Sequence, residues 1–176
     1  VVDTSGSMAD QNKLTQAQDA LNTFLDQILG DRDRVGLVPF SNRVYDPVPL
    51  KEIGSQRAIL KSKVTALKSD GRTAMLDGVG YAYDDLQRRN ERDRINAIVV
   101  MTDGLENASS TSLSSLTQRI KRTNASGVPV VIFCIGYGND ADFNALNGLA
   151  DTTGGFARRA DPDTIRRLYK ILSTYF

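Results

Sequence analysis

The stretch "VPVVIFCIG" (residues 128–136) is a run without a charged side chain, and it is rich in valine and isoleucine. A run of this length and composition predicts a strand that is buried on both faces, as in parallel sheets. "INAIVVM" (residues 95–101) has the same character, and "VGLVPF" (residues 35–40) predicts a third strand. The fold class then depends on what lies between these strands.

Helical patterns fill the intervals between the strands. Apolar residues recur at helical spacing in residues 14–28, 59–67, 76–86 and 113–120. Two more helices are predicted in residues 140–150 and 161–176, with a short strand at 156–158 between them. This alternation predicts an α/β fold with a doubly wound, mainly parallel sheet and helices on both faces. The 176 residues show no repeat or linker and therefore predict a single domain, 1–176.

The first strand is expected to be incomplete. Only two valines precede the polar stretch "DTSGSM" (residues 3–8), whereas a strand usually has about five or six residues. We therefore expect the domain to be N-terminally truncated within its first strand.

Composition excludes several classes of function. The 22 Lys and Arg residues balance 21 Asp and Glu, so no charge excess indicates nucleic acid, and no apolar run is long enough to insert directly into a membrane. The absence of histidine excludes Ser-His-Asp catalysis and His-ligated zinc. Cys134 lies within an apolar run and is expected to be a buried small residue rather than a reactive thiol.

Oxygen-bearing side chains follow two of the strands. Asp3, Ser5 and Ser7 stand at alternate positions, so in an extended loop they point to the same side. Asp103 follows the strand at 95–101, and it comes near Asp3 if that strand lies beside the first. Carboxylates and hydroxyls without nitrogen or sulfur suit a hard cation such as Mg²⁺, Mn²⁺ or Ca²⁺.

Ordinary structural roles compete with the metal hypothesis. Ser and Asp before a helix are common N-caps, worth about 1 kcal/mol, and "DG" at 103–104 is a common turn. A cap needs one residue, however, whereas here three stand in phase. The combination with Asp103 at a neighbouring strand end favours a metal site.

Three motifs resemble the metal-ion-dependent adhesion site (MIDAS) of von Willebrand factor type A domains. "DTSGSM" matches the family's Asp-x-Ser-x-Ser, "SDGRTAMLDGV" (residues 69–79) resembles its second loop and assigns Thr73, and "VVMTDG" resembles its third and assigns Asp103. The resemblance covers essentially the whole chain. Its last part, residues 152–176, looks most like bacterial surface proteins that carry such a domain.

The resemblance implies a fold and a set of roles. The fold would be a mainly parallel six-stranded sheet flanked by helices. Ser5 and Ser7 would be direct ligands, Thr73 a direct or water-mediated ligand, and Asp3 and Asp103 would act mostly through water. The ion would be Mg²⁺, with Mn²⁺ or Ca²⁺ as alternatives. An Asp or Glu carboxylate of a protein partner would fill its open position.

Three features remain open at this stage. Arg72, next to Thr73, departs from the small or uncharged residue usual in the family, and it either steers an anionic ligand or points to solvent. Glu106 either competes as a ligand or is a surface acid. In integrin-type relatives the last helix shifts on ligation, which would here involve residues 162–174, although any packed terminal helix shows the same apolar stripe.

The leading functional hypothesis is a non-enzymatic, cation-dependent binding or adhesion module at the cell surface or outside the cell. One alternative is an assembly domain in which the ion only braces the loops. The alternative location for such a domain is the cytoplasm. A metal-dependent hydrolase is the other alternative. A haloacid-dehalogenase-like enzyme, however, requires an Asp where this chain has Ser5, and no GxxxxGK[ST] loop is present.

Overall fold

A five-stranded parallel sheet forms the centre of the computed structural model, which describes residues 1–138, 140–161, 164 and 167. The strand order is β3-β1-β5-β6-β7, and every neighbouring pair is parallel. The strands are β1 Val2–Asp3, β3 Pro39–Phe40, β5 Asn96–Thr102, β6 Val130–Tyr137 and β7 Ala157–Ala160. The α/β class and the mainly parallel sheet are confirmed, with five strands in the described sheet where the resemblance implies six.

The two apolar runs form the middle of this sheet. β5 and β6 pair in register from Asn96 opposite Val130 to Thr102 opposite Gly136. All of β6 is buried except Val131, which is half-buried, as expected for a strand covered on both faces. Burial raises the pKa of the Cys134 thiol to about 12, so the expectation of a buried, unreactive cysteine is confirmed.

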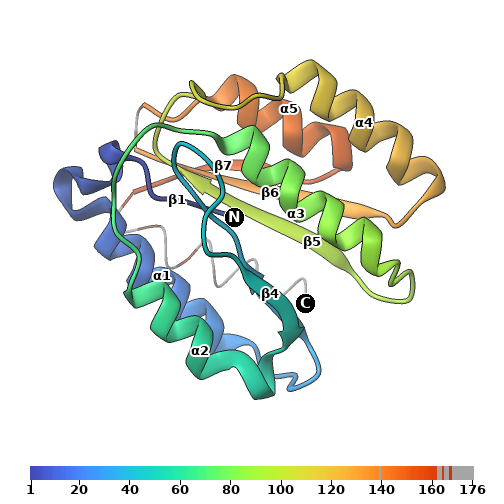
Figure 1. Ribbon diagram of the computed structural model, residues 1–176, viewed down its shortest axis with the longest axis horizontal. Coiled ribbons are helices and arrows are strands. Elements are labelled where there is room, and N and C mark those ends of the chain that lie inside the picture. The colour runs from blue at the N-terminus through green and yellow to red at the C-terminus, as the bar shows by residue number, and fades with distance from the viewer. Residues whose placement is uncertain (139, 162–163, 165–166, 168–176) are drawn as a thin grey trace.

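Helices cover both faces of the sheet (Figure 1). On one face lie α1 Lys13–Gln27 and α2 Ile53–Thr65, and on the other lie α3 Met75–Arg89, α4 Leu113–Ser126 and α5 Phe143–Thr153. The buried apolar side chains form one cluster on each face, so the sheet separates two cores. In α2 the buried stripe contains Ile53 rather than Ile59, which is 54% exposed. The helix predicted for residues 161–176, with its proposed shift, falls almost entirely outside the described residues.

Residues 35–40 form two short strands rather than the single predicted one. The first, β2 Arg34–Leu37, pairs antiparallel with β4 Val48–Glu52 in a separate two-stranded sheet. The chain then enters the main sheet as β3, which follows Val38. The division falls at Val38, directly before Pro39, which has no N–H to donate to a neighbouring strand. The sequence pattern also does not reveal β4, because Pro49 interrupts it, and proline is tolerated there since the strand belongs to a two-stranded edge.

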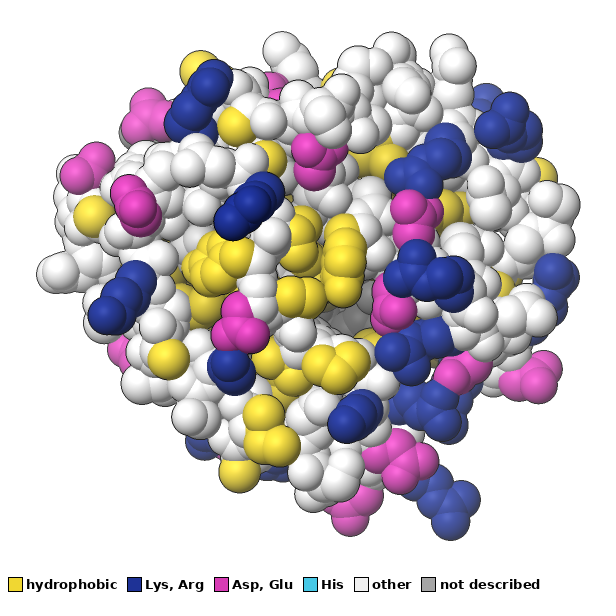
Figure 2. Space-filling view, viewed as in Figure 1, with side chains coloured by type: hydrophobic (Ala, Val, Ile, Leu, Met, Phe, Trp, Pro, Cys, Tyr) yellow, Lys and Arg dark blue, Asp and Glu magenta, His cyan; other side chains and the backbone are white. Residues whose placement is uncertain are grey.

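An apolar groove of about 470 Å³ opens between the β2–β4 pair and strand β5. Figure 2 shows the apolar side chains gathered in this hollow. Its walls include Val35, Ile98 and, from the start of the chain, Val1 and Val2. The incompleteness of the first strand stays a prediction.

Within the described part of the chain, no helix combines the length and the apolar character needed to cross a membrane.

Candidate metal centre

Asp3 ends strand β1 and is completely buried. Its Oδ1 accepts a hydrogen bond from the Ser5 backbone N–H at 2.7 Å, and its Oδ2 accepts one from the Thr102 hydroxyl. Burial raises the pKa of Asp3; hydrogen bonds from Thr102 and Ser5 oppose the rise, and the Asp103 charge adds to it. A cation beside Asp3 would therefore stabilise the ionised carboxylate.

The loop after β1 does not stay extended beyond Ser5. Gly6–Asn12 form the 3₁₀ segment η1, which is kinked at Asp10 and Gln11, and the Met8 N–H donates to the Ser5 carbonyl at 3.1 Å. The expectation that an extended loop aligns positions 3, 5 and 7 is therefore wrong for Ser7. The chain turns at Gly6, whose N–H donates to the Gly71 carbonyl of the second loop at 2.9 Å. The turn itself brings Ser7 Oγ within 3.1 Å of Ser5 Oγ.

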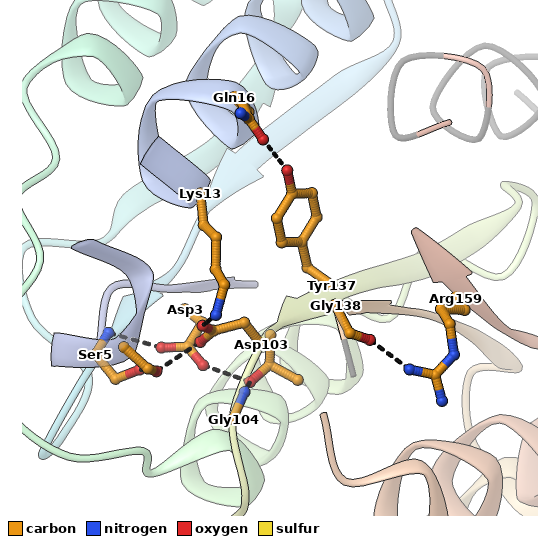
Figure 3. Close-up of polar contacts among 11 residues, drawn as sticks. Asp3, Ser5, Lys13, Gln16, Asp103, Gly104, Tyr137, Gly138 and Arg159 are labelled. Carbon is orange, nitrogen blue, oxygen red and sulfur yellow. Dashed lines mark hydrogen bonds and ion pairs between the residues drawn. The ribbon is translucent and has the colours of Figure 1, made fainter. Parts of the chain in front are cut away.

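Asp103 follows strand β5 and is also completely buried. β1 lies beside β5 with Val2 opposite Met101, which confirms the strand adjacency that the metal hypothesis requires. The Ser7 hydroxyl donates to Asp103 Oδ1 at 2.7 Å, although the two residues are 96 positions apart in the sequence. In Figure 3, Asp3, Ser5 and Asp103 face one another below the start of α1.

Thr73 reaches the same place from the second loop and is 3% exposed. Its backbone N–H donates to Asn107 Oδ1 at 3.0 Å, so the second loop is tied to the third. The Thr73 and Ser7 hydroxyls both lie next to Gly104. A Cβ added to Gly104 would lie 3.2 Å from Thr73 Oγ1 and 3.5 Å from Ser7 Oγ. The structure thus brings all five predicted residues to one edge of the sheet.

The donors of this cluster fit a hard cation. The described residues contain no group of three or more His, Cys, Asp and Glu side chains placed to hold a metal. The cluster instead combines two carboxylates with three hydroxyls, which are oxygen donors suited to Mg²⁺, Mn²⁺ or Ca²⁺. The side chain that glycine lacks at position 104 would crowd the hydroxyls of Thr73 and Ser7.

Lys13 is a member of the cluster that the sequence reasoning missed. It is the first residue of α1, it is 9% exposed, and its Nζ donates to Asp103 Oδ2 at 2.7 Å. Figure 3 shows its side chain descending from α1 onto the aspartates. A signal was available, because Lys13 lies four residues before the buried Ala17 and so continues the apolar face of the helix.

Glu106 caps helix α3 from the third loop. Its Oε2 accepts from the Leu76 backbone N–H at 2.9 Å, and its Oε1 accepts from the N–H groups of Ala108 and Ser109 at 3.1 and 2.8 Å. The α3 N-cap residue, Ala74, has no side-chain oxygen for this purpose. Both Glu106 oxygens are therefore engaged in holding the loop to the helix, which is neither of the two roles expected for it.

Asp77 fastens the same loop from the first turn of α3. Its carboxylate accepts from the backbone N–H groups of Ser110 and Thr111 at 2.8 and 3.1 Å. Partial burial alone would raise the pKa of Asp77, but the hydrogen bonds from Ser110 and Thr111 outweigh it, and the pKa is lowered. The charged form of Asp77 therefore favours the folded state.

Asp77→Asn is expected to lower the free energy of unfolding at neutral pH by about 1 kcal/mol. Because the folded pKa lies below the unfolded value of 3.8, this contribution is present above that value and is lost as the pH falls through the folded pKa. Urea unfolding of both proteins between neutral pH and about pH 3 measures it. The two stabilities should converge in acid, and a gap that widens as the pH falls would contradict the assignment.

Arg72 lies at the rim of the site and is exposed. Its backbone N–H donates to Asn42 Oδ1 at 2.8 Å, and its Nη2 donates to the Asn107 carbonyl. The loop that carries it is thus held at both sides. Steering of an anion by Arg72 stays a prediction.

Comparison with known proteins places the chain in a family. The sequence matches the von Willebrand factor type A domain over residues 1–170. It is 29% identical over 171 residues to inter-alpha-trypsin inhibitor heavy chain H4 of Bos taurus, a match that covers 93% of this chain and 18% of that protein. The chain therefore spans only a small part of this relative.

Two solved structures show the same fold. The pilus adhesin SpaC of Lactobacillus rhamnosus GG superposes with a TM-score of 0.80 at 17% identity, covering 99% of this chain and 30% of that one. Proximal thread matrix protein 1 of the mussel byssus, solved with a zinc-occupied MIDAS motif, superposes with a TM-score of 0.79 at 19% identity, covering 99% and 43%. The family match contains all three loops of the candidate site. The chain belongs to the von Willebrand factor type A domain family.

Proposed function

We propose that this domain is a divalent-cation-dependent protein-binding or adhesion module, in which the bound ion accepts a carboxylate from a partner. The observation that carries the proposal is the meeting of Asp3, Ser5, Ser7, Thr73 and Asp103, from three loops, at one edge of the sheet. Members of this family commonly act as protein-interaction and adhesion modules, and one similar structure is named as a pilus adhesin.

The hydrogen bonds suggest how the residues divide the work. Both oxygens of Asp3 and both oxygens of Asp103 already accept a hydrogen bond from a protein donor. The two aspartates are therefore suited to orient the serines and to act on an ion through water. The hydroxyls of Ser5, Ser7 and Thr73 would be the direct ligands. The mussel protein, which shares the fold, was solved with zinc in its MIDAS motif, and this supports metal binding by the corresponding loops.

We propose Mg²⁺ as the ion, because small oxygen donors without sulfur or nitrogen suit it, and Mn²⁺ and Ca²⁺ share this preference. When bound, the ion supplies an electrophilic position that an external oxygen anion can fill. The carboxylate of an Asp or Glu on a partner protein has this chemistry. The exposed guanidinium of Arg72 at the rim would attract such a partner.

A minimal carboxylate tests this function directly. N-acetyl-aspartate N-methylamide, titrated into the domain in saturating Mg²⁺ and followed by NMR, should shift amide signals of the loops around Ser5, Thr73 and Asp103. The matched control is the asparagine analogue, which has the same shape without the charge. The proposal fails if the two compounds give equal shifts, or if the aspartate compound gives the same shifts in excess chelator.

The same titration separates the alternative functions. An assembly domain whose ion only braces the loops would bind Mg²⁺ and ignore the aspartate compound. We propose no enzymatic activity: the inhibitor heavy chain and the pilus adhesin are not named as enzymes, and the chain has no histidine to act as a base. A surface or extracellular location is proposed on the likeness to a pilus adhesin.

A further inference from the structure

Lys13 places a positive charge inside the candidate metal site. Its Nζ lies 2.7 Å from Asp103 Oδ2, and its side chain is 11% exposed beside a carboxylate that is 0% exposed. Charged side chains are rarely buried unless they are paired, and here the partner is one of the predicted metal-site residues.

The start of α1, which carries Lys13, lies against the end of strand β6. Gly138, which has a φ of +81°, follows strand β6, and a Cβ added there would lie 4.0 Å from Lys13 Cε. One turn along α1, Gln16 accepts a hydrogen bond from the Tyr137 hydroxyl, which ties the start of the helix to the end of β6 (Figure 3). Lys13 is thus presented to Asp103 from the first residue of a helix whose first turn is tied to β6.

This charge changes the electrostatic balance of the site. With both aspartates ionised, Asp3 and Asp103 contribute two negative charges and Lys13 one positive charge, so their sum is one negative charge. A divalent ion would bring the sum to one positive charge, and a partner carboxylate would bring it to zero. Without Lys13, the ion alone would neutralise the site, and a carboxylate would then add an uncompensated negative charge.

We propose that Lys13 tunes the site for ligand binding: it weakens the affinity for the ion and strengthens the affinity of the bound ion for an anionic partner. The inference rests on the proposed function. Coulomb repulsion between the ammonium and the ion opposes metal binding, and attraction to the partner carboxylate favours the ternary complex. Lys13 also occupies Asp103 Oδ2, which keeps that oxygen from the ion. Ion and partner then stabilise each other's binding reciprocally.

Two variants test the role of the charge. Lys13→Met removes the charge and keeps most of the length, and Lys13→Gln also keeps an N–H donor for Asp103. Lys51→Met in strand β4, outside the site, is the control for net charge. Calorimetry measures the Kd for Mg²⁺, and NMR titration in saturating Mg²⁺ measures the Kd for N-acetyl-aspartate N-methylamide. Thermal unfolding of each variant verifies that it is folded.

Both Lys13 variants should bind Mg²⁺ about tenfold more tightly and the aspartate compound about tenfold more weakly, with Lys51→Met unchanged in both. Constants that stay unchanged, or that move in the same direction, overturn the inference and leave the proposed function in place. If the protein without any substitution binds no Mg²⁺, both the proposed function and the inference are overturned. A change in Lys13→Met that is absent in Lys13→Gln overturns the electrostatic explanation.

Discussion

Asp103→Ala is expected to lower the free energy of unfolding of the metal-free domain by about 3–5 kcal/mol. The variant removes the carboxylate that pairs with Lys13 and leaves a mostly buried ammonium without its counter-charge. It also removes the acceptor for the Ser7 hydroxyl, a bond of 2.7 Å. For a domain of this size, a loss of that magnitude is a large fraction of total stability. Urea unfolding in excess chelator measures it.

The double variant Lys13→Met/Asp103→Ala identifies the source of this loss. If the cost comes from the unpaired ammonium, the double variant should regain much of the stability, because it buries no charge at this position. Asp70→Ala, which removes an exposed carboxylate from the neighbouring loop, should change stability by less than about 0.5 kcal/mol. Equal losses in the single and double variants would show that the ion pair is not the cause.

Asp3→Ala is expected to weaken Mg²⁺ binding by about 10- to 100-fold. Asp3 is buried, and its Oδ1 holds the Ser5 backbone N–H at 2.7 Å, so the variant removes both a charge and the anchor of the serine loop. Isothermal titration calorimetry measures the change, with Asp70→Ala as the matched carboxylate control. Mg²⁺ affinity that survives in Asp3→Ala would remove Asp3 from the site.

Gly104→Ala supplies a second variant that keeps every acidic residue. The added methyl group would lie 3.2 Å from Thr73 Oγ1 and 3.5 Å from Ser7 Oγ, so it would crowd two proposed ligands. We expect Mg²⁺ affinity to fall while the fold is retained, because the nearest atoms are side-chain atoms and not backbone. A folded Gly104→Ala domain that binds Mg²⁺ normally would contradict the assignment of the Thr73 and Ser7 hydroxyls as ligands.

The sequence predicts the parts of the site that are local patterns at strand ends. Asp3 and Asp103 are predicted because each stands at the end of an apolar strand, and the parallel sheet brings those ends together. Ser7 is found for a partly wrong reason, since a 3₁₀ turn rather than an extended loop brings it to Ser5. The residue types and their spacing are sufficient to select Ser7 as a candidate. The path of the backbone around Ser7, however, depends on the hydrogen bond from Gly6 to Gly71, which lies far along the chain.

Lys13 and Glu106 show what local patterns cannot supply. Lys13 is defined by an ion pair with a residue 90 positions away, and Glu106 by a hydrogen bond from Leu76, in the first turn of α3, 30 positions earlier. Each role is created by the packing of separate elements. The helical spacing before Ala17 indicates that Lys13 faces inward, but it does not indicate the partner. The same applies to β4, whose pairing with β2 overrides a sequence in which Pro49 weakens the strand signal.

The most direct test of the central claim is a crystal structure of the domain with saturating Mn²⁺, examined by anomalous scattering. We expect one strong peak within coordination distance of Ser5 Oγ, Ser7 Oγ and Thr73 Oγ1, with Asp3 and Asp103 behind these ligands. The absence of a peak among these hydroxyls at saturating Mn²⁺, or a peak only elsewhere on the domain, would contradict it.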